Sequence, residues 1–320
     1  MHPDCQETLD LGTHRGLSVI TLGVAAGPAI RGPENGIATA VVVDDRFYLV
    51  DFGLGCTRAA HEAGLRGRDL AGMFITHLHS DHVAELPGYL LFNWGKPVDG
   101  LEAPVPVIGP GPDPERASGS LAGSRGLMDS ILRGFSYDLD IRIQDEGRPE
   151  LGRLLEVREL DDSFSEPTVV FEDSRVRVLA TSVDHPPVQP AYAYRFETLH
   201  GSVTISGDTT FCPALVELAR GTDLLVHEAV NVDFYREQGF SGAFLNHQLK
   251  SHTTPADAGR VACLSGVGQL VLSHLAGRAE DSWWVDQAAS AYRGPIRVAK
   301  SGMVLRVGHA PGDDGPAPTP

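Results

Sequence analysis

Residues 76–82 hold three imidazoles and one carboxylate, on His77, His79, Asp81 and His82. A short apolar stretch, 73–75, comes directly before them. Neutral imidazole and carboxylate are the groups that bind zinc and similar divalent metals when no thiolate is available. Without a metal, four such side chains in a core would repel and desolvate one another. The run therefore predicts a metal-binding loop that follows a strand.

Other polar side chains further along the chain share one position, just after a short apolar run. They are His185, Asp208, His227, Glu228 and His274. Loops at strand ends are held by a rigid sheet, and functional sites are usually built on them. A single His or Asp is more often an ordinary solvated or buried residue. The shared placement favours a functional role for His185, Asp208 and His274.

The elements that must position these residues alternate along the whole chain. Val, Ile and Thr enrichment predicts strands at 17–22, 37–43, 47–50, 176–180, 192–196, 203–206, 224–226 and 270–272, with two more near Ile296 and Val304. Helices are predicted at about 57–63, 121–135, 255–264 and 283–292. Thr254 is expected to be the N-cap of the helix that starts at Pro255. This alternation predicts an α/β protein built from layers of sheet and helix.

Composition limits the class of protein. The 320 residues include 42% hydrophobic residues, an ordinary value for a globular chain. The longest apolar stretches have the length of a strand, and the polar N-terminus lacks a signal region, so we expect no membrane association and a cytoplasmic protein. The four cysteines form no paired motif and are expected to be free thiols.

The net charge of −16 counts against nucleic acid as the partner. Proteins that bind nucleic acid usually carry a basic stripe, because neutralising phosphates supplies much of their affinity. Residues 97–170 contain 15 Asp and Glu against seven Arg and no Lys, a net charge of −8. We therefore expect a small organic substrate, with nucleic acid disfavoured but not excluded.

The order of the candidate ligands resembles a known pattern. His77-x-His79-x-Asp81-His82, followed by His185, Asp208 and His274, is similar to the metallo-β-lactamase superfamily, and most of all to its ribonuclease Z and arylsulfatase-like branch. Shorter matches lie at 51–53 (Asp-Phe-Gly), 206–210, 227–229 and 252–255. The resemblance spans about 18–307. It implies an αββα four-layer sandwich with the metal site at one edge of two mixed sheets.

The same resemblance implies a two-metal centre. One divalent ion would be held by His77, His79 and His185, and the other by Asp81, His82 and His274, with Asp208 bridging them. The ions are expected to be zinc, with Mn²⁺ or Fe²⁺ also compatible with nitrogen and oxygen ligands. A metal-bridging hydroxide would be the nucleophile, and Asp81 would also orient its proton.

The resemblance further implies a proton donor, His252, paired with the carboxylate of Glu228. An acidic partner would raise the pKa of this His and fix its tautomer. His252 can also be an ordinary loop residue. His227 is expected to be buried or to lie behind the ligands. Asp51 either orients a ligand His or simply forms a turn.

These observations predict a metal-dependent hydrolase at 17–308, preceded by an extension at 1–16 and followed by a disordered tail at 309–320. The first choice of substrate is a phosphodiester or sulfate ester of a small molecule. Alternatives are a ribonuclease Z-type tRNA 3′-processing endonuclease, a lactone or carboxylic ester hydrolase, and a non-catalytic member that keeps the metal ligands. The tRNA-processing members carry a basic, Gly-rich arm between the first and third motifs, where this chain is acidic.

Two further expectations remain. Residues 231–250 separate Glu228 from His252 and contain several aromatic residues, so they are either a lid over an organic substrate or a packed surface loop. Dimers are common in this branch, which implies a homodimer.

Overall fold

The computed structural model describes residues 9–113, 122–161, 164 and 166–308. Part of the predicted extension (1–8), the predicted tail (309–320) and Cys5 lie outside the described residues. Cys56, Cys212 and Cys263 are free thiols, as expected. Within the described ranges, no helix has both the length and the apolar character needed to cross a membrane.

The first sheet is mixed and has the strand order β14-β1-β2-β3-β4-β5-β6. Its strands are β1 (Leu17–Gly23), β2 (Ala38–Val43), β3 (Arg46–Val50), β4 (Leu70–Phe74), β5 (Val105–Pro110), β6 (Leu155–Leu160) and β14 (Met303–Val307). From β14 to β3 the neighbours are antiparallel, and from β3 to β6 they are parallel. The predicted hairpin of β2 and β3 is confirmed.

The second sheet repeats this plan with the order β13-β12-β11-β10-β9-β8-β7. Its strands are β7 (Thr168–Glu172), β8 (Val176–Ser182), β9 (Tyr192–Thr198), β10 (Gly201–Ile205), β11 (Leu224–Val230), β12 (Gln269–Ala276) and β13 (Ile296–Val298). Strands β8 and β10 run in the same direction because both pair antiparallel with β9. Their C-terminal ends therefore reach the same edge of the sheet.

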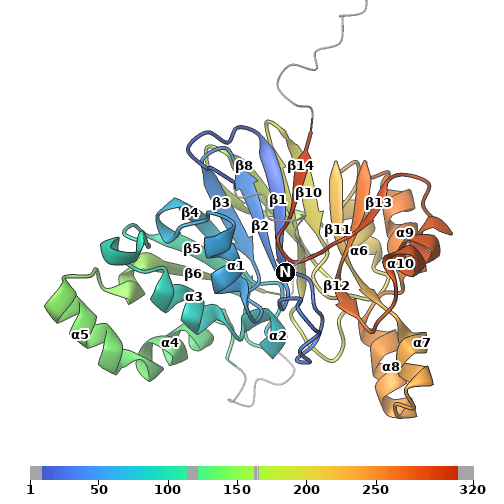
Figure 1. The fold of residues 1–320 in the computed structure, drawn as a ribbon, viewed down its shortest axis with the longest axis horizontal. Coiled ribbons are helices and arrows are strands. Elements are labelled where there is room, and N and C mark those ends of the chain that lie inside the picture. The colour runs from blue at the N-terminus through green and yellow to red at the C-terminus, as the bar shows by residue number, and fades with distance from the viewer. Residues whose placement is uncertain (1–8, 114–121, 162–163, 165, 309–320) are drawn as a thin grey trace, which may run out of the picture.

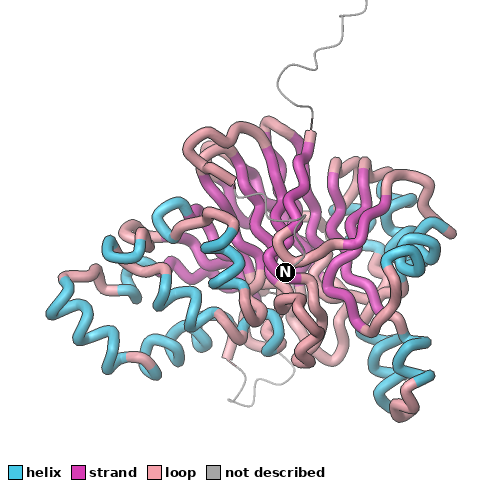
Figure 2. Tube along the Cα trace, in the orientation of Figure 1, coloured by secondary structure: helices cyan, strands magenta, loops and turns pink. Residues whose placement is uncertain are grey.

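Helices cover the outer face of each sheet (Figure 1). The first sheet carries α1 (Cys56–Glu62), α3 (Leu86–Phe92), α4 (Ser124–Gly134) and α5 (Ser136–Glu146), and the second carries α6 (Pro213–Leu218), α9 (Pro255–Ser265) and α10 (Asp281–Ala289). Figure 2 shows the strands gathered between the two groups of helices. The remaining helices are α2 (Ser80–Val83), α7 (Val232–Glu237) and α8 (Gly242–Ser251), with 3₁₀ turns at Gly67–Asp69, Lys96–Val98 and Leu151–Leu154. This is the predicted αββα sandwich.

Three apolar layers hold the sandwich together. One lies between the sheets, where the rings of Phe74, Tyr194 and Phe196 pack with Phe74 centroids 5.3 and 5.1 Å from the other two. The other two lie between each sheet and its helices. Because β1 and β2 are covered on both faces, every residue in them is buried. This explains why neither strand shows the strict apolar–polar alternation of a half-exposed strand.

Several sequence-based predictions need correction. Residues 231–250, predicted to be either a lid or a packed surface loop, form α7 and most of α8. The strands predicted to end before His227 and His274 continue through both residues. In contrast, the side-chain oxygen of Thr254 accepts a hydrogen bond from the Asp257 amide at 3.2 Å, which confirms the predicted N-cap of α9.

Candidate metal centre

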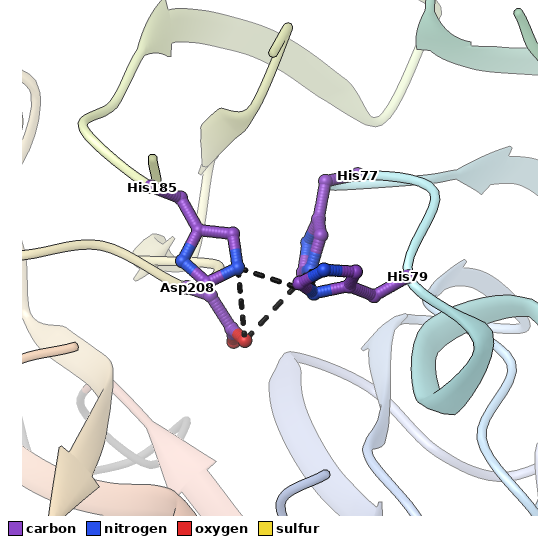
Figure 3. Close-up of side chains that lie close together, drawn as sticks. All are labelled: His77, His79, His185 and Asp208. Carbon is purple, nitrogen blue, oxygen red and sulfur yellow. Dashed lines mark hydrogen bonds and ion pairs between the residues drawn. The ribbon is translucent and has the colours of Figure 1, made fainter. Parts of the chain in front are cut away.

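The predicted ligands meet at one edge of the sandwich. His77 and His79 follow β4, His185 follows β8 and Asp208 follows β10. Figure 3 shows these four side chains pointing toward one another. Each of them offers one ligand atom, and all four atoms lie within 4.8 Å of one another.

Three imidazoles in this first group converge on a small space. The Nδ1 atom of His79 lies 3.1 Å from Nε2 of His77 and 3.2 Å from Nε2 of His185. The Oδ2 atom of Asp208 is 3.8 Å from Nε2 of His77 and 3.9 Å from Nε2 of His185. Ring nitrogens that face one another at such distances match the side chains of a metal site.

A second group lies beside the first and contains Asp81, His82 and His274. The two Nε2 atoms of His82 and His274 are 3.3 Å apart, and Oδ2 of Asp81 is 3.4 Å from Nε2 of His274. The same Oδ2 atom of Asp208 lies 3.4 Å from Nε2 of His82 and 3.3 Å from Nε2 of His274. Asp208 therefore stands between the two groups.

Backbone irregularities aim two of these side chains. His274 is the extra residue of a β-bulge, because Glu228 pairs with Ser273 and Ala229 pairs with Leu275. Its φ of 42° is uncommon for a residue with a side chain, and a bulge of this kind redirects the side chain while the strand continues.

Gly207, just before Asp208, has a φ of 60°, and a Cβ there would lie 2.6 Å from the carbonyl oxygen of Tyr192. Only glycine fits this turn.

Hydrogen bonds from outside the two groups fix the rings. The carboxylate of Asp51 accepts from Nδ1 of His82 at 2.8 Å and from both the amide and the hydroxyl of Thr76 at 2.8 Å. Nδ1 of His185 lies 2.7 Å from the carbonyl oxygen of Ser251. Groups that hold the far nitrogen of a ligand His orient the ring and select its tautomer. Asp51 was predicted either to orient a ligand His or only to form a turn. Its hydrogen bond to His82 supports the first prediction.

The protonation of the first group suits a cation. Burial lowers the pKa of His77 and His79, and lowers that of His185 to about 3, so these rings stay neutral. Burial raises the pKa of Asp208, but the nearby His274 and His82 outweigh this and hold it well below its usual range. Asp208 Oδ1 and His274 Nδ1 are buried without a hydrogen-bond partner among the described residues. Neutral imidazoles and an ionised carboxylate with one unpartnered oxygen fit a divalent metal.

His252 and Glu228 lie next to the second group. Nδ1 of His252 is 3.0 Å from Oε2 and 3.1 Å from Oε1 of Glu228, and Thr209 donates its amide to Oε1 at 2.7 Å. Burial lowers the pKa of His252, but the charge of Glu228 outweighs it and raises this pKa to about 9. His252 is therefore a protonated imidazole at neutral pH.

His227 belongs to neither group, and its Nδ1 lies 2.8 Å from the carbonyl oxygen of Glu228. It is fully buried, and burial lowers its pKa to about 4.

A cavity of about 740 Å³ opens onto the centre. Its floor includes His79, Asp81, Asp208, His252 and His274, and its walls come from 26–31 and from α7 and α8. No described residue of the acidic stretch 97–170 lines it. The charge of that stretch therefore says little about the surface that a substrate meets.

Comparison with known proteins identifies the family. The chain is 31% identical over 285 residues to a ribonuclease Z of Mycobacterium marinum (strain ATCC BAA-535 / M), covering 87% of this chain and 95% of that one. The chain belongs to the ribonuclease Z family. A family model described as anti-Pycsar protein Apyc1 also matches residues 17–93.

Solved structures support the ribonuclease Z fold across the chain. The metallo-β-lactamase fold protein YhfI of Bacillus subtilis has a TM-score of 0.63 at 18% identity and covers 91% of this chain and 99% of that one. Human tRNase Z, short form, has a TM-score of 0.63 at 22% identity with the same coverage. Zn²⁺-bound PqqB from Methylobacterium extorquens has a TM-score of 0.58 at 15% identity, covering 90% and 99%. The protein is a metal-dependent hydrolase with the metallo-β-lactamase fold, as predicted.

Membership of the ribonuclease Z family overturns one prediction. The expectation of a small-molecule ester as the main substrate, with nucleic acid disfavoured, is wrong. It relied on the acidic stretch 97–170, whose described residues form β5, β6, α4 and α5 and do not line the cavity. The ribonuclease Z side of the resemblance is confirmed, and the arylsulfatase side stays a prediction.

All seven predicted ligands and the His252–Glu228 pair are brought together at the centre. Sequence reasoning missed the contacts of Thr76 and Ser251. Thr76 lies inside the 76–82 run, so its position was a usable signal. Ser251 acts through its backbone carbonyl, which leaves no mark in the sequence.

Proposed function

We propose that this protein is a ribonuclease Z-type endonuclease that processes the 3′ ends of tRNA precursors. The observation that carries the proposal is the match to ribonuclease Z along 87% of the chain, at 31% identity. The convergence of seven ligand-type side chains beside a paired imidazole and carboxylate supports the same chemistry.

In this proposal the centre holds two divalent ions, with zinc as the first choice. His77, His79 and His185 would hold one, Asp81, His82 and His274 the other, and Asp208 would reach both. When bound, such ions activate water at neutral pH and stabilise charge that develops on phosphoryl oxygens. Two divalent ions would exceed the charge of Asp81 and Asp208, so the centre would attract a phosphodiester.

The side chains around the centre have separate tasks. Asp81 accepts a hydrogen bond from the Gly27 amide at 2.8 Å, which fixes its carboxylate toward the cavity and lets it orient the nucleophile's proton. His252 would donate a proton to the leaving oxygen, because it lines the cavity and is protonated at neutral pH. The carboxylate of Glu228 would stabilise the protonated form of His252 through its contact with Nδ1.

Cleavage of a precursor tRNA with a 3′ trailer tests the proposal. The protein is loaded with zinc, its metal content is measured, and the products are sized on a gel. His252→Ala should lower turnover by about 10²–10⁴-fold, typical of losing a general acid, and should leave the metal content unchanged.

His61→Ala is a matched control, because His61 is an exposed residue at the end of α1 and lies outside the cavity. It should cleave like the wild type. A fully metal-loaded wild type that leaves the precursor intact would contradict the proposed function. Loss of metal in His252→Ala would instead contradict the role of His252.

A further inference from the structure

One wall of the cavity is an aromatic platform formed by α7, α8 and the segment between them. The rings of Phe240 and Phe244 lie 4.8 Å apart with an interplanar angle of 38°. Tyr235 packs edge-on behind them, at 5.2 and 5.0 Å. Tyr235 is buried in a small apolar cluster that also contains Ala26, so the platform is fixed to the body of the protein. Phe240 itself is 46% exposed although it lines the cavity.

The same wall carries a buried amide without a partner. Gln248 lines the cavity and is only 7% exposed, and its Oε1 atom has no hydrogen-bond partner among the described residues. A buried polar atom left unpaired costs free energy, which a ligand donor would recover. An amide offers both a donor and an acceptor, the combination found along the edge of a nucleobase.

Two guanidinium groups complete the wall. Two hydrogen bonds hold Arg31. Its Nε donates to the Ala26 carbonyl oxygen at 2.8 Å, and its Nη2 donates to the Tyr235 hydroxyl at 2.7 Å. Arg278 is exposed and also lines the cavity. In a chain with a net charge of −16, two arginines at one cavity provide a local site for phosphate.

An aromatic platform, an unpaired amide and two arginines match the base, the base edge and the phosphate of one nucleotide. His252 lies one helical turn after Gln248 and lines the same cavity. We infer that this cavity is a nucleobase pocket that holds the nucleotide carrying the leaving oxygen, with its base against Phe240 and Phe244 and its edge on Gln248. This inference rests on the proposed function. It goes further by naming the part of the substrate that contacts α7 and α8, which is the base of one nucleotide.

Equilibrium binding tests the pocket without any cleavage step. Zinc-loaded full-length protein is titrated with adenosine 5′-monophosphate and with ribose 5-phosphate, which has the same phosphate and sugar but no base. Stacking of one base on aromatic side chains should make the nucleotide bind about tenfold more tightly. Phe240→Ala should remove most of this difference, and it is expected to fold because the ring is half exposed. Gln248→Leu should reduce the difference and change the preference among bases.

Leu249→Ala is the matched control, since Leu249 is 52% exposed on the same helix and does not line the cavity. It should keep the wild-type ratio. Equal affinity of the wild type for both ligands would overturn the pocket, as would an unchanged ratio in Phe240→Ala.

The two proposals can fail separately. If precursor tRNA is cleaved while the base adds no affinity, the pocket fails and the proposed function stands. If the base adds affinity through Phe240 while precursor tRNA stays intact, the proposed function fails and the pocket stands.

Discussion

The metal centre and the α7–α8 cap face the same cavity but are built in opposite ways. The centre takes its side chains from strand ends of both sheets, from the interior of β12 and from α2, and most of them are buried. The cap consists of two short helices held mainly by one small apolar cluster around Tyr235. The centre is dense in titratable groups, whereas the cap presents aromatic rings and an amide.

This difference separates chemistry from selection. The centre needs several groups placed within a few tenths of an ångström, which only a rigid sheet edge can hold. The cap tolerates small shifts of its side chains, because each aromatic ring contributes to substrate binding through its contact area. The two regions meet at the end of α8, where the Ser251 carbonyl holds His185 and the next residue is His252.

The largest effect is expected at Asp208, the side chain that stands between both ligand groups. Asp208→Asn keeps the shape but removes the charge, so it should lower metal content and reduce cleavage by at least about a thousandfold. Elemental analysis together with the cleavage assay measures both. Full metal content with normal turnover would show that the centre does not depend on this carboxylate.

The next effect should come from Glu228, which affects proton transfer more than metal binding. In Glu228→Gln, His252 loses the negative charge that raises its pKa, so the protonated donor disappears at a lower pH. Turnover should fall by about 10–100-fold, and the alkaline limb of the pH–rate profile should move to lower pH. An unchanged alkaline limb would contradict the pairing of Glu228 and His252 in the reaction.

A smaller effect is expected at Asp51, which touches a ligand ring from behind. Asp51→Asn should weaken metal binding by about 10–100-fold, because the carboxylate no longer holds Nδ1 of His82. Competition with a chelator measures this change, and turnover at saturating zinc should stay close to the wild type. A large loss of turnover in fully loaded protein would place Asp51 nearer the reaction than its contacts suggest.

The smallest effect should arise on the cap side. Tyr235→Phe removes only the hydroxyl that accepts from Arg31, a hydrogen bond worth about 1 kcal/mol. We expect a KM for precursor tRNA a few-fold higher, with kcat and metal content unchanged. A change in metal binding instead would contradict the division in which the cap affects substrate binding and the centre holds the metal.

The sequence predicts the outline of the fold but not all of its helices and strands. The apolar runs located β1–β3 and β8–β13, and the N-cap residue Thr254 located α9. Strands β5–β7 and helices α2, α3 and α5–α8 were not predicted. The sequences of these segments show no clear hydrophobic periodicity. Packing against the rest of the protein stabilises such elements more than local propensity does, so the local sequence does not reveal them.

The sequence by itself determined the chemistry at this site. Residues 76–82 already contain four ligand-type side chains, and their spacing is local information that no distant contact can change. The tertiary structure decided how that chemistry is used. Two placements depend on segments far apart in the chain: the bulge that turns His274 inward and the Ser251 carbonyl behind His185. The same holds for the cavity lining, to which the described residues of the acidic stretch 97–170 do not contribute. Such placements result from packing between distant elements, which residue spacing along one segment does not encode.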